Sequence, residues 1–168
     1  KNCKVIDNSI FVREVIDLLL FNENKKEESL VILSPDAGAY KKIGKLCDKI
    51  NFKGEIVASN KYRNISSGNI ESLELSKLDF EGKDILIVDD ICVGGKTFIE
   101  LAKKLRERNI GKLHLIVSHG IFSNGLRELN TYFDNIFVTD SRCLFMKDKD
   151  FMLKNDGDMD KLNVFDCE

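Results

Sequence analysis

The sequence contains little proline and histidine and no tryptophan. Proline occurs once in 168 residues, histidine occurs twice and tryptophan is absent. Because neither proline-rich nor serine-rich stretches interrupt it, a linker or a disordered region is not expected. The length suits a single domain, so we predict one folded unit over residues 1–168.

The cysteines are scattered along the chain, and their number and spacing exclude two classes of small protein. The chain has five of them, at positions 3, 47, 92, 143 and 167, and no two form a Cys-x-x-Cys pair. An odd, scattered set with only two histidines predicts neither a structural zinc site nor a disulfide framework. Reduced thiols of this kind are typical of a cytoplasmic protein.

Neither a charge excess nor a long apolar run is present. Lysine and arginine number 26 against 28 aspartate and glutamate, a net charge of −2, so no basic field favours nucleic acid. The run Leu18–Phe21 is far shorter than the ~20 residues of a membrane-spanning helix. We therefore expect no nucleic-acid partner and no membrane. At 43% hydrophobic residues, the chain can still bury a core.

Apolar runs alternate with amphipathic stretches along the chain. The run Leu30–Leu33 reads as a strand buried on both faces, and 85–88 is the strongest strand signal. Strands are expected at 30–33, 55–59, 84–90, 113–118, 136–138 and 163–165, and helices at 10–21, 40–50, 98–105 and 126–130. The polar stretch 60–79 is expected to be a mobile loop or flap. This alternation predicts an α/β domain with a mostly parallel sheet flanked by helices.

One segment combines acidic residues with a glycine-bearing loop. Asp89 and Asp90 end the strongest strand, Gly94 and Gly95 follow, and Lys96-Thr97 opens a helix. The first turn of a helix offers unpaired backbone N–H groups, which suit a phosphate. The two carboxylates suit sugar hydroxyls or a bridging cation. Together these groups predict a site for a ribose that carries a terminal phosphate.

Two other interpretations compete for this segment. A Walker-type loop requires a glycine five residues before Gly95, but Asp90 stands there, and a carboxylate would repel a triphosphate. A plain strand-to-helix turn would explain the glycine pair alone, although it leaves the two acids unexplained.

The same segment resembles the ribose-phosphate loop of type I phosphoribosyltransferases. Four further blocks are similar to ribose-phosphate pyrophosphokinases (PRPP synthetases): Ser34-Pro35-Asp36-Ala37-Gly38, Lys61-Tyr62-Arg63, Ser118-His119-Gly120-Ile121-Phe122-Ser123 and Val138-Thr139-Asp140-Ser141. The five blocks occur in the family's order. The resemblance implies a type I phosphoribosyltransferase-like fold, and it covers the carboxyl-terminal half of a two-domain enzyme. A start at Lys1 also favours a fragment.

The resemblance implies an activity and its residues. Ribose 5-phosphate would receive the diphosphoryl group of ATP on O1, giving PRPP and AMP. Lys61 and Arg63 would be the catalytic cations of the flap, and Asp36 would bind Mg²⁺, although it is also a good helix cap. The substrate would be held by Asp89, Asp90, Val93, Gly94, Gly95, Lys96 and Thr97. A homo-oligomer is implied by analogy.

Departures from the family keep alternatives open. Val93 stands where the family has an acid, Gly94 replaces a hydroxyl residue and Lys96 replaces glycine. A phosphoribosyltransferase that consumes PRPP, or a non-catalytic regulatory subunit, therefore remains an alternative. His119, just past a strand, is either a substrate-site residue or a turn residue, whereas His114 is expected to be structural.

Overall fold

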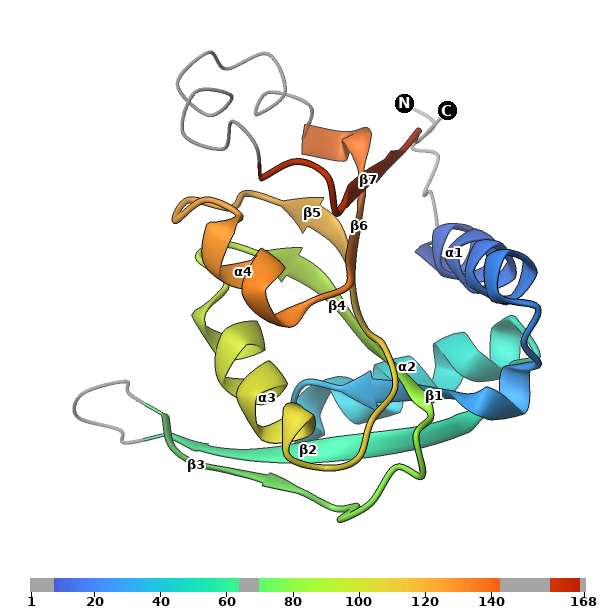
Figure 1. The fold of residues 1–168 in the computed structure, drawn as a ribbon, viewed down its shortest axis with the longest axis horizontal. Coiled ribbons are helices and arrows are strands. Elements are labelled where there is room, and N and C mark those ends of the chain that lie inside the picture. The colour runs from blue at the N-terminus through green and yellow to red at the C-terminus, as the bar shows by residue number, and fades with distance from the viewer. Residues whose placement is uncertain (1–7, 64–69, 143–157, 167–168) are drawn as a thin grey trace, which may run out of the picture.

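A computed structural model describes residues 8–63, 70–142 and 158–166. Seven strands form one sheet in the order β3-β2-β1-β4-β5-β6-β7 (Figure 1). The strands are β1 (Leu30–Ser34), β2 (Glu55–Arg63), β3 (Ile70–Leu75), β4 (Asp84–Cys92), β5 (Leu113–Gly120), β6 (Asn135–Thr139) and β7 (Leu162–Phe165). The helices are α1 (Asn8–Glu23), α2 (Ala37–Lys49), α3 (Lys96–Arg106) and α4 (Arg127–Tyr132), with short 3₁₀ turns at Glu27–Ser29 and Asp140–Arg142.

The sheet is parallel except at one edge. β1 pairs with β2 and β4, and β5, β6 and β7 continue in the same direction. Only β3 runs antiparallel, against β2. The predicted α/β class with a mostly parallel sheet is therefore confirmed, and the strand expected at 163–165 is the edge strand β7.

Helices cover both faces of the sheet. On β4, Ile85 and Ile87 join the core with α3 and α4, whereas Leu86 and Val88 join the core with α1 and α2 (Figure 1). Burial on both faces explains why the strand reads as a continuous apolar run. The helix predicted at 10–21 is α1. Of the four apolar residues whose near-helical spacing predicts it, Val15 and Leu19 are buried, whereas Ile10 is 63% and Leu18 38% exposed.

The stretch predicted as a loop at 60–79 is largely a β-hairpin. β2 continues past the end of β1 to Arg63 and pairs with β3, from Ser59 opposite Leu75 to Arg63 opposite Ile70. Polar residues hid this arrangement, because the backbone hydrogen bonds between two strands need no apolar periodicity. Residues 64–69 lie outside the described part of the chain.

Within the described residues, every helix is too short or too polar to cross a membrane.

Candidate functional site

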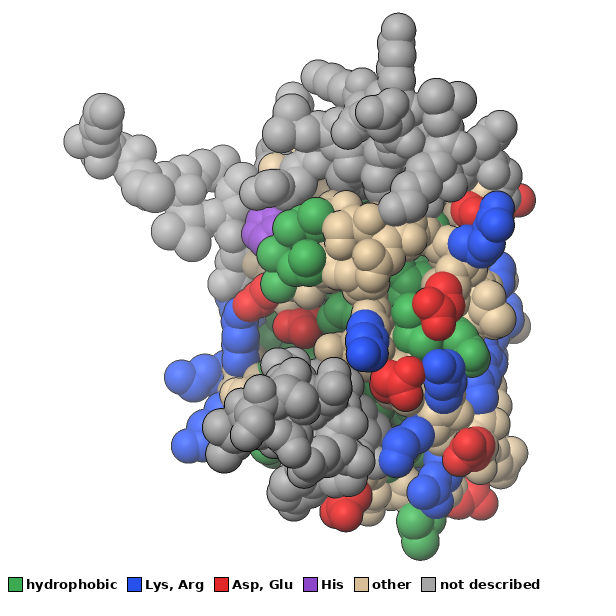
Figure 2. Space-filling model, turned by 90° about the vertical axis from the view of Figure 1, so that its left-hand side faces the viewer, with side chains coloured by type: hydrophobic (Ala, Val, Ile, Leu, Met, Phe, Trp, Pro, Cys, Tyr) green, Lys and Arg blue, Asp and Glu red, His purple; other side chains and the backbone are tan. Residues whose placement is uncertain are grey.

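Neighbouring parallel strands bring two sequence motifs to one edge of the sheet. β1 ends at Ser34 and β4 at Cys92, and the two strands pair side by side. A cleft of about 270 Å³ opens there, lined by Pro35, Asp36, Asp89, Ile91, Val93, Gly94, Gly95, Lys96, Thr97 and Phe98. The ends of β4 and β5 point to the left in Figure 1, the side that faces the viewer in Figure 2, where acidic and hydrophobic side chains adjoin. Carboxyl ends of parallel strands are where such sheets bind ligands.

The loop after β4 turns into α3 through a glycine in the left-handed region. Gly95 has φ of 79° and caps the helix that begins at Lys96. A Cβ atom at Gly95 would lie 3.2 Å from the Leu129 side chain. Gly95 provides no side-chain acceptor to cap the first turn of α3, and the first two residues of this turn, Lys96 and Thr97, line the cleft. This arrangement suits an anion.

A second loop, after β5, fixes the first one. The Ile121 amide donates to the Cys92 carbonyl at 2.8 Å, and the Ser123 amide donates to the Val93 carbonyl at 2.8 Å. The Asn124 side-chain amide donates to the Gly94 carbonyl at 3.0 Å. The carbonyls of the loop are therefore bound from behind, which holds its backbone in place.

The acidic groups of the cleft repel one another. Burial, with the charges of Asp90 and Asp36, raises the pKa of Asp89, although the Asp90 amide donates to Oδ1 of Asp89 at 2.8 Å. Asp90 is ion-paired with Lys42 of α2. Asp36 caps α2, because its Oδ1 accepts from the Ala39 amide at 2.7 Å. A ligand that donates hydrogen bonds, or a cation, would relieve this repulsion.

The cleft gathers most of the predicted site. It contains seven of the predicted positions, namely Asp36, Asp89, Val93, Gly94, Gly95, Lys96 and Thr97. Asp90 is not among the lining residues and forms its ion pair with Lys42 instead. Lys61 and Arg63 lie on β2 in the hairpin, opposite Leu73 and Ile70. Since β2 is parallel to β1, the hairpin extends from the same edge of the sheet as the cleft.

Two further residues, His119 and Cys92, lie near the ends of β5 and β4. His119, expected just past a strand, lies within β5 with an exposed side chain, and its Nδ1 lies 2.6 Å from Oγ of Ser141 in the 3₁₀ turn after β6. Cys92 is fully buried, and burial raises the pKa of its thiol to about 12, so a thiol reagent is a poor probe of this loop.

Sequence reasoning missed Lys42 and Asn124. Lys42 and Asp90 are 48 positions apart, and Asn124 and Gly94 are 30 apart, so no local pattern links them.

Comparisons with known proteins agree with this geometry. Ribose-phosphate pyrophosphokinase of Sulfurisphaera tokodaii is 30% identical over 105 residues, covering 62% of this chain and 35% of that protein. The enzyme of the same name from Mycoplasmopsis pulmonis is 31% identical over 118 residues, covering 69% of this chain and 36% of that protein. The chain thus spans about a third of the length of these curated relatives.

A solved structure shares the fold. Phosphoribosylpyrophosphate synthetase from Mycobacterium smegmatis superposes with a TM-score of 0.72 at 19% identity, covering 95% of this chain and 46% of that one. The family model described as the phosphoribosyl transferase domain matches residues 4–142. With the cleft at the carboxyl ends of β1 and β4, this match shows that the chain belongs to the phosphoribosyl transferase domain family.

Proposed function

We propose that the cleft is the ribose 5-phosphate site of a ribose-phosphate diphosphokinase. In this reaction O1 of ribose 5-phosphate attacks the β-phosphorus of ATP, AMP leaves, and PRPP forms. The observation that carries the proposal is that Asp89 and residues 94–97 line the same cleft, at the carboxyl ends of β1 and β4. The names of the curated relatives support the same reaction class.

The sugar phosphate would lie with its two ends on different groups. The 5-phosphate would accept from the first-turn N–H groups of α3, with Lys96 adding positive charge. The ribose hydroxyls would donate to Asp89, whose pKa is raised by burial and by the neighbouring acids Asp90 and Asp36. Val93, 51% exposed at the rim, offers no polar group where the family has an acid.

Lys61 and Arg63 would act on the transferred group. Phosphoryl transfer spreads negative charge over oxygens, and fixed cations lower the barrier. The hairpin of β2 and β3 extends from the binding edge, a position from which these residues could close over the cleft and exclude water.

The donor set at this edge fits Mg²⁺. Asp36 and Asp89 supply carboxylate oxygens, which Mg²⁺ prefers as ligands; burial first, and then the charges of Asp90 and Asp36, raise the pKa of Asp89. Asp36 would hold the ion, with one of its oxygens bound by the Ala39 amide. Bound there, Mg²⁺ would neutralise phosphate oxygens of the ATP and PRPP.

The rest of the proposal concerns the whole protein. We propose a cytoplasmic homo-oligomer that binds ATP with ribose 5-phosphate. That residues 1–168 form one domain, the carboxyl-terminal half of a two-domain enzyme, stays a prediction.

Calorimetric titration with ribose 5-phosphate tests the binding site. We expect one site per chain, and Asp89→Asn should weaken binding by roughly tenfold or more, because a charge-assisted hydrogen bond contributes about 1.5–3 kcal/mol. Asp48→Asn, at an exposed position of α2, is the matched control. Equal binding by all three proteins would contradict the proposed site.

A second assay tests the reaction. The full-length protein is incubated with ATP, Mg²⁺ and ribose 5-phosphate, and AMP and PRPP are measured. Lys61→Ala should cut turnover about a hundredfold or more and leave ribose 5-phosphate binding largely intact. Loss of binding in Lys61→Ala would show that its assigned role is wrong. PRPP consumption with a base, in place of AMP formation, would favour a phosphoribosyltransferase. Val93→Asp introduces the acid that the family has at this position. Formation of AMP by this variant but not by the parent protein would favour a non-catalytic subunit.

A further inference from the structure

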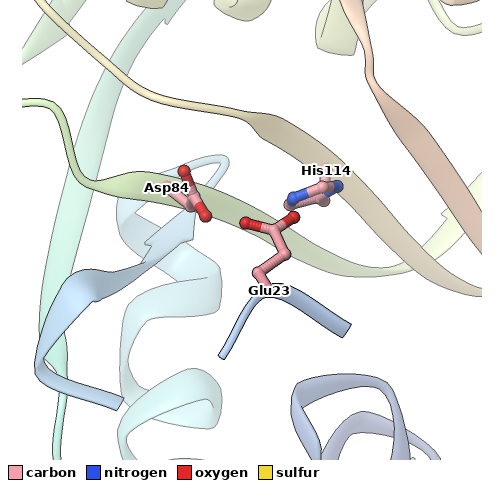
Figure 3. Close-up of side chains that lie close together, drawn as sticks. All are labelled: Glu23, Asp84 and His114. Carbon is pink, nitrogen blue, oxygen red and sulfur yellow. The ribbon is translucent and has the colours of Figure 1, made fainter. Parts of the chain in front are cut away.

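A second cluster of polar side chains lies on the opposite edge of the sheet. Glu23 ends α1, Asp84 opens β4, and His114 stands near the start of β5 (Figure 3). One potential ligand atom from each residue lies within 4.8 Å of the others. Because Asp84 begins the strand whose other end forms the cleft, this cluster is separate from the proposed substrate site.

His114 carries a buried nitrogen that no described residue satisfies. The side chain is fully buried, and Nε2 has no hydrogen-bond partner within the described residues. Nδ1 lies 3.3 Å from the side-chain amide of Asn135. Figure 3 shows one ring nitrogen turned toward the Glu23 carboxylate. A buried polar atom without a partner is costly, so a ligand for it is favoured.

A cation already lies between the two carboxylates. Nζ of Lys25 is 2.6 Å from Oε2 of Glu23 and 2.6 Å from Oδ2 of Asp84. Nζ of Lys112 lies 2.8 Å from Oε1 of Glu23. The Lys25 side chain is 35% exposed, and a long flexible lysine can swing into solvent. The position between the carboxylates is therefore built for positive charge, and its occupant can leave.

We propose that Glu23, Asp84 and His114 form a binding site for a divalent transition metal of the Zn²⁺ class, which displaces the Lys25 ammonium. One imidazole nitrogen with two carboxylate oxygens is a donor set that Zn²⁺ accepts, whereas Mg²⁺ and Ca²⁺ prefer oxygen alone. Bound there, the ion would link the end of α1 to β4 and β5. The Lys112 ammonium stays with the second oxygen of Glu23 and limits the negative charge of the site.

Burial favours the neutral form of the His114 imidazole, which is the form that binds a metal. Burial lowers the pKa of His114, with the nearby acids Asp84, Asp134 and Glu23 acting against that effect. A neutral ring keeps a lone pair for coordination.

Titration of the metal-free protein with Zn²⁺ is the first test. Calorimetry should find one ion per chain at micromolar or lower dissociation constant, with no comparable signal for Mg²⁺. Glu23→Gln and His114→Asn should each weaken binding by about tenfold or more, since even outer partners of metal ligands change affinity by 10–100-fold. Glu14→Gln, an exposed acid on α1, is the control. Failure to bind Zn²⁺, or equal binding by His114→Asn, would overturn the proposal.

Two further measurements check independently which residues bind the ion. Co²⁺ in place of Zn²⁺ reports its ligands by absorption, and a thiolate band would show that cysteines hold the ion, which would also overturn the proposal. Lys25→Met keeps all three ligands and removes the competing ammonium, so it should bind Zn²⁺ more tightly than the parent protein and gain more thermal stability from it. Unchanged or weaker Zn²⁺ binding by Lys25→Met would mean that Lys25 is a permanent partner. Neither experiment uses ribose 5-phosphate, so the proposed function stands or falls separately.

Discussion

The two edges of the sheet carry similar residues in opposite electrostatic states. At the amino-terminal edge, Asp84 is 2% exposed and accepts from the Lys112 amide at 2.8 Å and the Lys25 ammonium at 2.6 Å. At the carboxyl-terminal edge, Asp89 lies beside two other acids, and its pKa is raised. Both aspartates belong to the same strand, β4.

The two carboxylates differ in how many hydrogen-bond donors the chain itself supplies to them. Asp84 is surrounded by donors from the chain itself, so its charge contributes to the stability of the fold. Asp89 lacks enough donors, so its charge costs stability unless a ligand supplies them. An acid with a raised pKa in an open cleft is typical of a functional site. Opposite effects of one substitution at the two positions would confirm this contrast.

The largest effect is expected at the amino-terminal edge. Asp84→Asn removes the charge that binds Lys25, and it should lower the free energy of unfolding by about 2–3 kcal/mol. Urea denaturation followed by circular dichroism measures this loss. Asp48→Asn on the exposed side of α2 should change stability little, and a loss as small as that control would break the contrast.

The second largest effect is expected at Gly95, in the loop between β4 and α3. Gly95→Ala places a Cβ at φ of 79° and 3.2 Å from Leu129, and it should cost about 1–2 kcal/mol of stability. Ribose 5-phosphate binding should fall as well, because the N–H groups of the loop move. Gly44→Ala is the matched control: no atom lies within 4 Å of its added Cβ, and alanine in a helix should raise stability slightly. Similar outcomes for both variants would contradict the assigned geometry.

A smaller effect is expected behind the loop. Asn124→Ala removes the hydrogen bond to the Gly94 carbonyl, at about 1 kcal/mol, and should weaken ribose 5-phosphate binding severalfold. Asn22→Ala, at an exposed position of α1, should leave binding unchanged. Calorimetry compares the two. Full affinity in Asn124→Ala would show that the loop holds its shape without this contact.

The smallest effect has the opposite sign. Because the pKa of Asp89 is raised above 3.8 in the folded protein, its contribution to stability is present below that value and is lost as pH rises through the raised pKa. Asp89→Asn should therefore be more stable than the parent near neutral pH, and the gain should shrink toward about pH 3. Thermal unfolding across this range measures the difference. A variant that is less stable at neutral pH would remove the basis for calling Asp89 strained.

Much of the fold followed from local patterns, and the failures have a common cause. The apolar run 85–88 predicted β4, and Asp36 was recognised as a cap for α2. The hairpin of β2 and β3 was missed because polar strands lack the alternation that buried ones show. Ile10 and Leu18 are exposed on α1, because spacing alone does not tell which apolar residues of a helix face the core.

The candidate site likewise has a part that the sequence predicts and a part that it does not. The resemblance and the motif around Asp89 predicted most of the cleft. The ion pair of Lys42 with Asp90 depends on how α2 packs on the sheet, which no stretch of sequence encodes alone. The grouping of Glu23 with His114 likewise depends on where α1 ends against the sheet.

One feature of β4 bears on how this protein can change. The four residues between Asp84 and Asp89, Ile85–Val88, are at most 1% exposed, so an apolar segment of roughly 16 Å separates these two charges. Substitutions that far apart should combine additively, and an Asp84, Asp89 double variant should show the sum of its parts. New ligand preferences can then arise by mutation in the cleft without disturbing the anchorage on the far side, which leaves the pocket free to evolve.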